Sequence, residues 1–320
     1  MINVRNISKL YNSVKAVNNV TFRVQKGETL ILLGPSGCGK TTTLRMLNRL
    51  IEPSEGSIEL DGRNILNQQP EKLRRGIGYV LQHNGLFPHY TVAENVAIVP
   101  KLLRWDKQRI AKRSAELLEK LHLPAAKYLH AFPAQLSGGQ QQRVGLARAL
   151  MANPPVLLMD EPLGALDPVT RATIRKEFNQ LDELKDKTIV MVTHDIMEAI
   201  ELGDRICLMN QGTIEQIGTP YQLLFEPQND FVKEFFNDQR LQLELKTLSM
   251  LTIWDYLPQQ DDPQTAITLD DQTGVWEALA ALLRSDNNRV RIKNSLTSEY
   301  KAYGYKELMT AYSDFKDRSV

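Results

Sequence analysis

The sequence predicts an α/β protein with a core of parallel strands, an inserted helical subdomain and a small α+β domain at its C-terminal end. Three observations predict this class. Short, continuous apolar runs alternate with helical segments, which is typical of parallel sheets covered by helices. A glycine-rich loop joins one such strand to a helix. After about residue 236 the sequence changes character and becomes rich in turn-like, polar segments.

The first elements are strands. Residues 2–7 and 17–24 alternate apolar and polar side chains, which indicates strands with one buried face. The run 29–33 is continuously apolar and ends in Gly34, as expected of a strand buried on both faces. Residues 40–50 follow with a helical pattern.

The middle of the chain supplies the rest of the core. From about residue 84 to residue 153 the pattern is helical, and 107–121 is its clearest helix, so we expect a helical subdomain over 84–153. The remaining expected elements are strands at Ile77–Gln82, Val156–Asp160 and Thr188–Thr193, and helices at Val169–Leu184 and Asp195–Leu202.

The C-terminal part predicts a separate small domain. We place its boundary after residue 236, which gives domains of 1–236 and 237–320. The expected elements are a short strand before a helix capped by Thr273, a strand at 290–294, a strand near 300–303 and a helix at 306–312.

Composition limits the possible functions. The chain has 320 residues, 42% hydrophobic and 24% charged, which is ordinary for a globular protein of about two domains. A net charge of +1 gives no support for binding nucleic acid. With only Cys38 and Cys207, no disulfide framework is expected, which fits a reducing cytosol. No run reaches the roughly 18–20 apolar residues of a spanning helix, so any membrane role is expected through a partner.

GPSGCGKT at Gly34–Thr41 fits the phosphate-loop pattern G-x-x-x-x-G-K-[ST] and lies between a predicted strand and helix. Its backbone N–H groups are expected to surround phosphates, while Lys40 reaches the β- and γ-phosphates and Thr41 ligates Mg²⁺. The candidate phosphate-binding residues are Gly34, Pro35, Ser36, Gly37, Cys38, Gly39, Lys40, Thr41 and Thr42.

Polar side chains follow three predicted strands. Asp160 and Glu161 end the run VLLMDE; we expect Asp160 to hold Mg²⁺, directly or through water, and Glu161 to activate an attacking water. Gln82 and His194 follow two other strands, at the edge where parallel sheets place their ligands. Gln82 is a candidate contact to Mg²⁺ or to the water.

The string LSGGQ begins another helix. Ser137 is expected to cap it, and the glycines leave its first N–H groups uncovered, which suits an anion. No phosphate-binding pattern lies near it in the chain, so the anion is not identified by these residues alone.

Taken together, these motifs resemble the ATP-binding subunits of ABC transporters over about residues 1–236. The matching motifs are Tyr11, GPSGCGKT, Gln82, LSGGQ, VLLMDE, Ala165-Leu166-Asp167 and His194. The resemblance implies ATP hydrolysis with ATP and Mg²⁺, and two chains that pack head to tail as a homodimer. Ser137, Gly138, Gly139 and Gln140 of one chain would then cover the ATP held by Lys40 of the other.

The resemblance also implies roles for single residues. Tyr11 would stack on the adenine ring, and His194 would hold the γ-phosphate and orient the water with Glu161. Asp167 would bridge the two chains. Glu161, His194 and Gln82 are therefore the expected catalytic residues, and Thr41, Gln82 and Asp160 the expected metal ligands. All of them are present, which disfavours a binding module without turnover.

The segment Gln82–Val96 has clustered apolar residues, Leu86, Phe87, Pro88 and Tyr90 among them. The resemblance implies that membrane-spanning permease subunits dock there. It further implies a peripheral location on the cytoplasmic face of the membrane and a separate extracytoplasmic solute-binding protein.

Three segments, 46–56, 84–105 and 229–236, resemble ATPases of bacterial osmoprotectant importers, which carry glycine betaine, choline, carnitine or proline. The alternative transport function is import of another small solute, an amino acid or a polyamine. An ABC ATPase acting on nucleic acid or ribosomes is disfavoured, because the chain has neither a second ATPase unit nor a long coiled-coil insertion.

The predicted order of elements in 237–320 resembles a single cystathionine-β-synthase-type (CBS) motif. Such motifs normally pair, so a single copy implies pairing across a homodimer and a regulatory or dimerisation role. The alternative is a small stabilising appendage.

Overall fold

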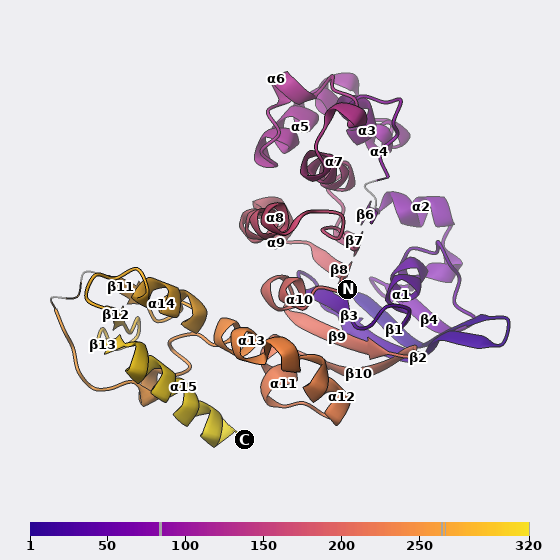
Figure 1. Ribbon diagram of the computed structural model, residues 1–320. Coiled ribbons are helices and arrows are strands. Elements are labelled where there is room, and N and C mark those ends of the chain that lie inside the picture. Colours follow the sequence, from indigo (N-terminus) through magenta and orange to yellow (C-terminus); the bar gives the residue numbers. More distant parts are fainter. Residues whose placement is uncertain (83–84, 264, 266, 320) are drawn as a thin grey trace. The chain divides into compact units, whose positions relative to one another are not determined.

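A computed structural model describes residues 1–82, 85–263, 265 and 267–319 (Figure 1). The chain divides into two compact units, Met1–Ile217 and Gly218–Val320. The boundary predicted after residue 236 therefore falls inside the second unit. The reason is that helices α11 (Pro220–Phe225) and α12 (Asp230–Phe235) pack against each other, and α11 packs on α13 (Arg240–Thr247), which follows the predicted boundary.

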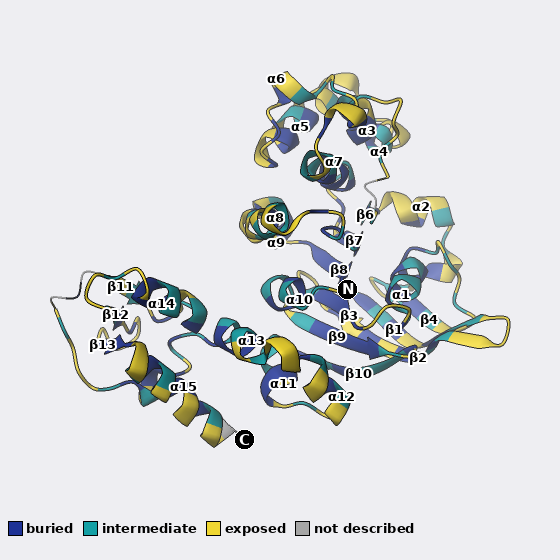
Figure 2. Ribbon diagram, viewed as in Figure 1, coloured by how far each residue is buried: buried dark blue, intermediate teal, exposed yellow. Residues whose placement is uncertain are grey.

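The centre of the first unit is a six-stranded sheet of order β10-β9-β3-β8-β7-β6. Strands β3, β8, β7 and β6 run parallel, as predicted, and β9 runs parallel to β3; every residue of β7 and β8 is buried (Figure 2). Strands β9 and β10 were not predicted. The bounds are β3 (Thr29–Leu33), β6 (Ile77–Val80), β7 (Val156–Asp160), β8 (Thr188–Val192), β9 (Arg205–Asn210) and β10 (Thr213–Gly218).

A second, antiparallel sheet of order β2-β1-β4-β5 completes the strands of this unit. The first two strands are longer than predicted because they pair with each other almost to their connecting turn. The last two were not predicted. The bounds are β1 (Ile2–Tyr11), β2 (Val14–Val24), β4 (Glu55–Leu60) and β5 (Arg63–Asn64).

The helical stretch predicted over 84–153 consists of five helices that group together in Figure 1. The longest of them, α5, begins after its N-cap Asp106, whose side chain accepts a hydrogen bond from the backbone of Arg109. The bounds are α3 (Val92–Val96), α4 (Ile98–Leu102), α5 (Lys107–Lys120), α6 (Ala125–Tyr128) and α7 (Gly138–Leu150). Residues 83 and 84, at the start of this stretch, lie outside the described residues.

Helix boundaries differ from the predictions where a buried side chain or a cap ends the helix. The helix predicted at 169–184 is two helices, because Leu181 is buried in an extended conformation between them. The strand predicted to end at Gln82 ends at Val80, so Gln82 lies in the segment that follows. The remaining helices of the unit are α1 (Lys40–Leu47), α2 (Pro70–Arg75), α8 (Pro168–Gln180), α9 (Asp182–Lys185) and α10 (Ile196–Leu202).

The second unit ends in a small mixed sheet in which β12 pairs parallel with β11 and antiparallel with β13. Its order of strand, helix, two strands and helix is the predicted one. The predicted cap is wrong, because the N-cap of α14 is Gly274, which has no side chain to accept a hydrogen bond. The bounds are β11 (Thr268–Asp270), α14 (Val275–Leu282), β12 (Arg289–Lys293), β13 (Tyr300–Gly304) and α15 (Tyr305–Ser319).

A membrane-crossing helix must be long and nearly free of charge. Among the helices that the structure describes, none meets both requirements.

Candidate active site

The glycine-rich loop lies between β3 and α1 and encloses a cavity of about 300 Å³. Two of its glycines are required by close backbone approaches. A Cβ on Gly34 would lie 2.1 Å from the carbonyl oxygen of Met209, and one on Gly39 would lie 2.5 Å from that of Ala16. Both also have positive φ angles, of 146° and 101°, which side chains disfavour. The loop is therefore held in one shape by its neighbours.

Lys40 points into this loop and is almost fully buried. Its Nζ donates hydrogen bonds of 2.8 Å to the carbonyl oxygens of Gly34 and Pro35. A buried ammonium is tolerated only when its donors are used. An anion in the loop would offer the same donors stronger, charged acceptors.

Asp160 ends β7, and its side chain is only 1% exposed. The Thr41 hydroxyl donates to its Oδ1 at 3.0 Å. Arg45 and the Tyr79 hydroxyl lie 3.5 and 3.4 Å from its Oδ2. Burial and the nearby Asp160 carboxylate raise the pKa of Tyr79 to about 12, so its phenol remains a proton donor.

The pair formed by Thr41 and Asp160 offers a hydroxyl and a carboxylate oxygen side by side. Oxygen ligands of this kind are the ones that Mg²⁺ takes beside a bound nucleotide. The donor set therefore fits a magnesium ion at the mouth of the loop.

Side chains that follow two neighbouring strands converge on Glu161, which itself follows a third strand. Its Oε2 accepts a 3.0 Å hydrogen bond from the Gln82 amide and lies 3.2 Å from Nδ1 of His194. These residues follow β6, β7 and β8, which are adjacent in the sheet. The predicted metal ligand Gln82 thus contacts Glu161 rather than the Thr41–Asp160 pair. Glu161 also has a φ of 46°, a conformation that is rare for this residue type and was not predicted.

Ser137 caps α7 as predicted. Its hydroxyl accepts from the backbone of Gln140, whose side chain in turn accepts from the Ser137 backbone, which makes a reciprocal capping box. Ser137 and Gly138 are exposed. A Cβ on Gly139 would lie 3.0 Å from a methyl group of Thr170, so the helix start lies against α8.

Two other predicted residues lie apart from the phosphate loop. Tyr11 ends β1, is half-exposed, and has the Lys9 ammonium 5.3 Å from its ring centroid. It is not among the residues that line the loop's cavity. Asp167 caps α8 by accepting from the backbone of Thr170 and Val169. Hydrogen bonding to the Thr170 side chain, and then to these backbone groups, holds the pKa of Asp167 below its usual range.

Two partners of Asp160 were not predicted from the sequence: the cationic Arg45 and the phenolic Tyr79. A signal existed for Arg45, because it lies four residues after Thr41 on the same helix and therefore on the same face. Tyr79 lies on β6, and only the pairing of β6 with β7 brings it beside Asp160.

Comparison with known proteins gives consistent results. The family model described as "ABC transporter" matches residues 17–164. The choline transport ATP-binding protein OpuBA of Bacillus subtilis is 52% identical over 75% of this chain, and the match spans 63% of that relative. The glycine betaine/carnitine/choline transport ATP-binding protein OpuCA of the same organism matches to the same extent. The chain thus covers less than two thirds of these two relatives.

A third relative covers nearly the whole chain. The osmoprotectant import ATP-binding protein OsmV of Salmonella typhimurium is 44% identical over 95% of this chain and 78% of its own length. Among solved structures, a dimeric ATP-binding cassette in a post-hydrolysis state, bound to ADP and Pi, matches with a TM-score of 0.61. The two sequences are 35% identical, and the match spans 68% of this chain and 98% of the solved chain.

A phosphate loop on a parallel sheet, three converging strand-end side chains and these levels of identity all agree. The chain belongs to the ABC transporter family, as an ATP-binding subunit.

Proposed function

We propose that this protein is the ATP-hydrolysing subunit of an importer for osmoprotectants, namely quaternary amines such as glycine betaine, choline or carnitine. The observation that carries the proposal is the convergence of Gln82 and His194 on Oε2 of Glu161, beside the phosphate loop, in a chain that is 44% identical to an osmoprotectant import protein.

In this proposal the loop binds the phosphates of ATP. Lys40 exchanges its two carbonyl acceptors for phosphate oxygens, and Thr41 and Asp160 hold Mg²⁺, which neutralises charge on the phosphates. Glu161 accepts a proton from the attacking water, which it holds together with Gln82 and His194. Tyr11, which is exposed, is free to stack on the adenine ring.

The exposed start of α7 supports a homodimer in which each ATP is shared. Backbone N–H groups at a helix start attract anions. Among the described residues, Ser137 makes no hydrogen bond to the phosphate loop of its own chain. We assign Ser137, Gly138, Gly139 and Gln140 to the ATP of the partner, with Asp167 at the contact between subunits. Two similar solved structures are themselves dimeric.

An apolar cavity of about 310 Å³ supports docking of a permease subunit. It is lined by Leu81, Phe87, Ile98 and Val99, among others. Phe87 is 51% exposed, and its ring centroid lies 5.4 Å from that of Tyr90. Exposed, clustered aromatic rings are typical of a protein-contact surface. The subunit would then work peripherally, on the cytoplasmic face of the membrane, with a separate extracytoplasmic solute-binding protein.

Import of another small solute is the alternative. The sulfate/thiosulfate import ATP-binding protein CysA of Pseudomonas syringae is 47% identical over 74% of this chain. The ATPase core is therefore similar across transporters of different solutes, and the solute has to be tested directly.

For the last part of the second unit we propose a regulatory or dimerisation role with the character of a single CBS motif. The support is its order of elements, β11-α14-β12-β13-α15, with one parallel and one antiparallel pair. Leu283 is exposed at the end of α14, and pairing with a second copy would cover such apolar groups. The alternative remains a stabilising appendage.

The decisive experiment co-purifies the chain with its membrane subunits and solute receptor and measures ATP turnover. Glycine betaine, choline, carnitine or proline should stimulate turnover, whereas sulfate, an amino acid other than proline or a polyamine should not. Stimulation by one of the latter alone would refute the osmoprotectant assignment and leave the ATPase assignment intact.

The shared-ATP arrangement has its own test. Ser137→Arg should abolish turnover by the dimer but leave ATP binding to the isolated subunit unchanged, because Ser137 would contact only the partner's nucleotide. Loss of ATP binding by the isolated subunit would show that the arrangement is wrong.

A further inference from the structure

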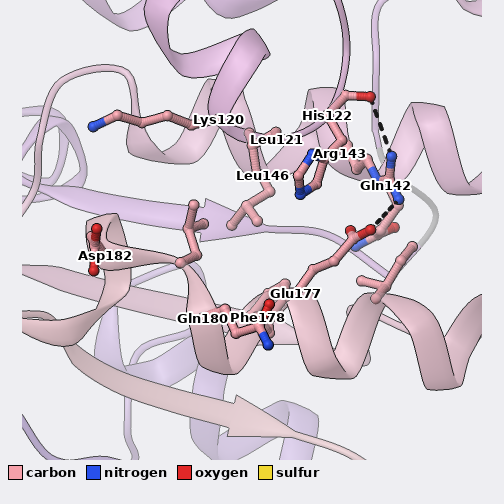
Figure 3. Close-up of a pocket in the computed structure, with 12 residues that line it drawn as sticks. Lys120, Leu121, His122, Gln142, Arg143, Leu146, Glu177, Phe178, Gln180 and Asp182 are labelled. Atoms are coloured by element: carbon pink, nitrogen blue, oxygen red, sulfur yellow. Dashed lines mark hydrogen bonds and ion pairs between the residues drawn. The ribbon is translucent and has the colours of Figure 1, made fainter.

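The first unit contains another cavity, of about 300 Å³, that has no part in the candidate active site. It lies among the end of α5, the middle of α7 and the end of α8 (Figure 3). Figure 3 shows Leu121 and Leu146 on one side of it and Glu177 on the helix opposite. Its size is at the lower end of the range for small-molecule sites.

The walls are mainly apolar. Leu121, Leu146, Ile174 and Leu181 are all buried and line the cavity. Ile174 also belongs to a small hydrophobic cluster against which Phe178 packs. Such side chains can pack against the apolar part of a ligand.

Polar and charged side chains also line the cavity, and one of the polar ones, Gln142, is buried. Gln142 is only 3% exposed, yet its side-chain amide makes no hydrogen bond to any other residue that the structure describes. Buried amides are normally paired, since leaving one unpaired costs free energy. Gln142 therefore offers one unused N–H donor and one unused carbonyl acceptor to whatever enters the cavity.

The charged residues at the rim are already paired. Arg143 contacts Glu177 at 2.8 Å, Lys120 contacts Glu183 at 2.7 Å, and Asp182 contacts Lys185 at 2.6 Å. A charged ligand would have to compete with these ion pairs and would lose its hydration on entry. The site thus favours a neutral molecule.

We propose that this cavity is a binding site for a small neutral molecule with an apolar body and one carboxamide group. The body lies against Leu146 and Ile174. The carboxamide pairs reciprocally with the Gln142 amide, because each offers one donor and one acceptor. The occupant touches both α7 and α8. This site is separate from the nucleotide and does not depend on ATP hydrolysis.

Benzamide is a suitable probe, and the test uses the full chain without nucleotide. The methyl resonance of Ile174 should shift saturably as benzamide is added. Gln142→Leu should weaken benzamide binding roughly three- to tenfold, the loss expected for one neutral hydrogen-bonded contact. The same change at the exposed Gln108 of α5 should have no effect.

Two further probes separate the contributions. Toluene, which lacks the amide, should bind the Gln142→Leu variant at least as well as the original chain. Benzoate should bind more weakly than benzamide. Gln142→Leu breaks no side-chain hydrogen bond among the described residues, so it should stay folded, and a thermal unfolding curve checks this.

The proposal is overturned if no saturable shift occurs up to the solubility limit of benzamide, or if a folded Gln142→Leu binds benzamide with unchanged affinity. Equal binding of benzoate would overturn the preference for neutral ligands. None of these outcomes depends on turnover, so the proposed transport function stands or fails by its own experiments.

Discussion

Two clusters built around carboxylates, one cluster in each unit, differ in how fully their carboxylate oxygens are paired. At the end of β7 in the first unit, Asp160 and Glu161 take part in contacts of 3.0–3.5 Å with side chains of other elements. In the second unit Glu244 of α13 is fully buried and accepts a 2.6 Å hydrogen bond from Arg240 and a 2.9 Å one from Lys316.

The carboxylate oxygens of Glu244 are fully used as hydrogen-bond acceptors. The Tyr312 hydroxyl also donates to it, so two cations and a phenol surround one carboxylate. Burial alone would raise the pKa of Glu244, but these hydrogen bonds outweigh burial and lower it. Glu161 instead shares a single oxygen between Gln82 and His194 at the edge of a cavity. Saturation is typical of a structural cluster, and free capacity of a reactive one.

The largest expected effect is on turnover at the unsaturated cluster. Glu161→Gln should lower the rate of ATP hydrolysis by roughly 10²–10⁴-fold, because an amide does not accept the proton of the attacking water. ATP binding should be retained, since the substitution leaves the phosphate loop intact. Steady-state phosphate release and equilibrium nucleotide binding measure the two. Near-normal turnover would exclude Glu161 as the base and break the comparison.

The saturated cluster should respond in stability. Glu244→Ala leaves Arg240, Lys316 and Tyr312 without their shared acceptor, which should cost about 3–5 kcal/mol of local stability. Hydrogen exchange of the amides in α13 and α15 measures this directly. The exposed Glu234 is the control, because its change to alanine should shift stability by less than about 0.5 kcal/mol. Equal protection in the two variants would contradict the structural role.

Glu183 is an intermediate case within the first unit. It lies 2.6 Å from Arg113 and 2.7 Å from Lys120, and hydrogen bonding to Arg113 lowers its pKa from 4.5 to about 2. Because the folded-state pKa is lowered, the stabilisation is present above pH 4.5 and is lost as the pH falls toward 2.

The corresponding variant is Glu183→Gln. It should lower the free energy of unfolding by about 1 kcal/mol at pH 7, a value discounted for solvent screening. The deficit should shrink below pH 4.5. Urea unfolding midpoints measured from pH 7 to pH 3 provide the check, and a deficit independent of pH would mean that packing, not charge, is responsible.

The smallest effect is expected at Tyr79. Its 3.4 Å contact to Asp160 is long for a hydroxyl donor, so Tyr79→Phe should cost less than about 1 kcal/mol of stability. Turnover should change less than about threefold, since Thr41 still contacts Asp160. A loss as large as that of Glu161→Gln would place Tyr79 in the catalytic machinery.

Much of the fold was predictable because it follows from local patterns of apolar and polar residues. The buried strands 29–33 and 156–160 have the predicted bounds, since apolar runs bounded by polar, glycine or proline residues mark both ends. Strands β4, β5 and β10 were missed, because their weaker patterns become strands only through pairing with other strands. The break at Leu181 was missed for a related reason: it depends on burial of that side chain. Strand β9 was missed although its buried apolar run 206–209 is a local signal of the same kind as those of the predicted strands.

The residue types of the candidate site were likewise readable, but its geometry was not. Sequence by itself determined a phosphate loop, a capped helix at Ser137 and carboxylates at the end of a strand, because each depends on neighbours within a few residues. Only the tertiary structure decided that Gln82 and His194 share one oxygen of Glu161 and that Glu244 is saturated. At the site, the contacts to Glu161 join residues that are 33 and 79 positions apart in the sequence, and the contact of Tyr312 to Glu244 joins residues 68 positions apart. Sheet order and packing, rather than local sequence, bring such distant residues together.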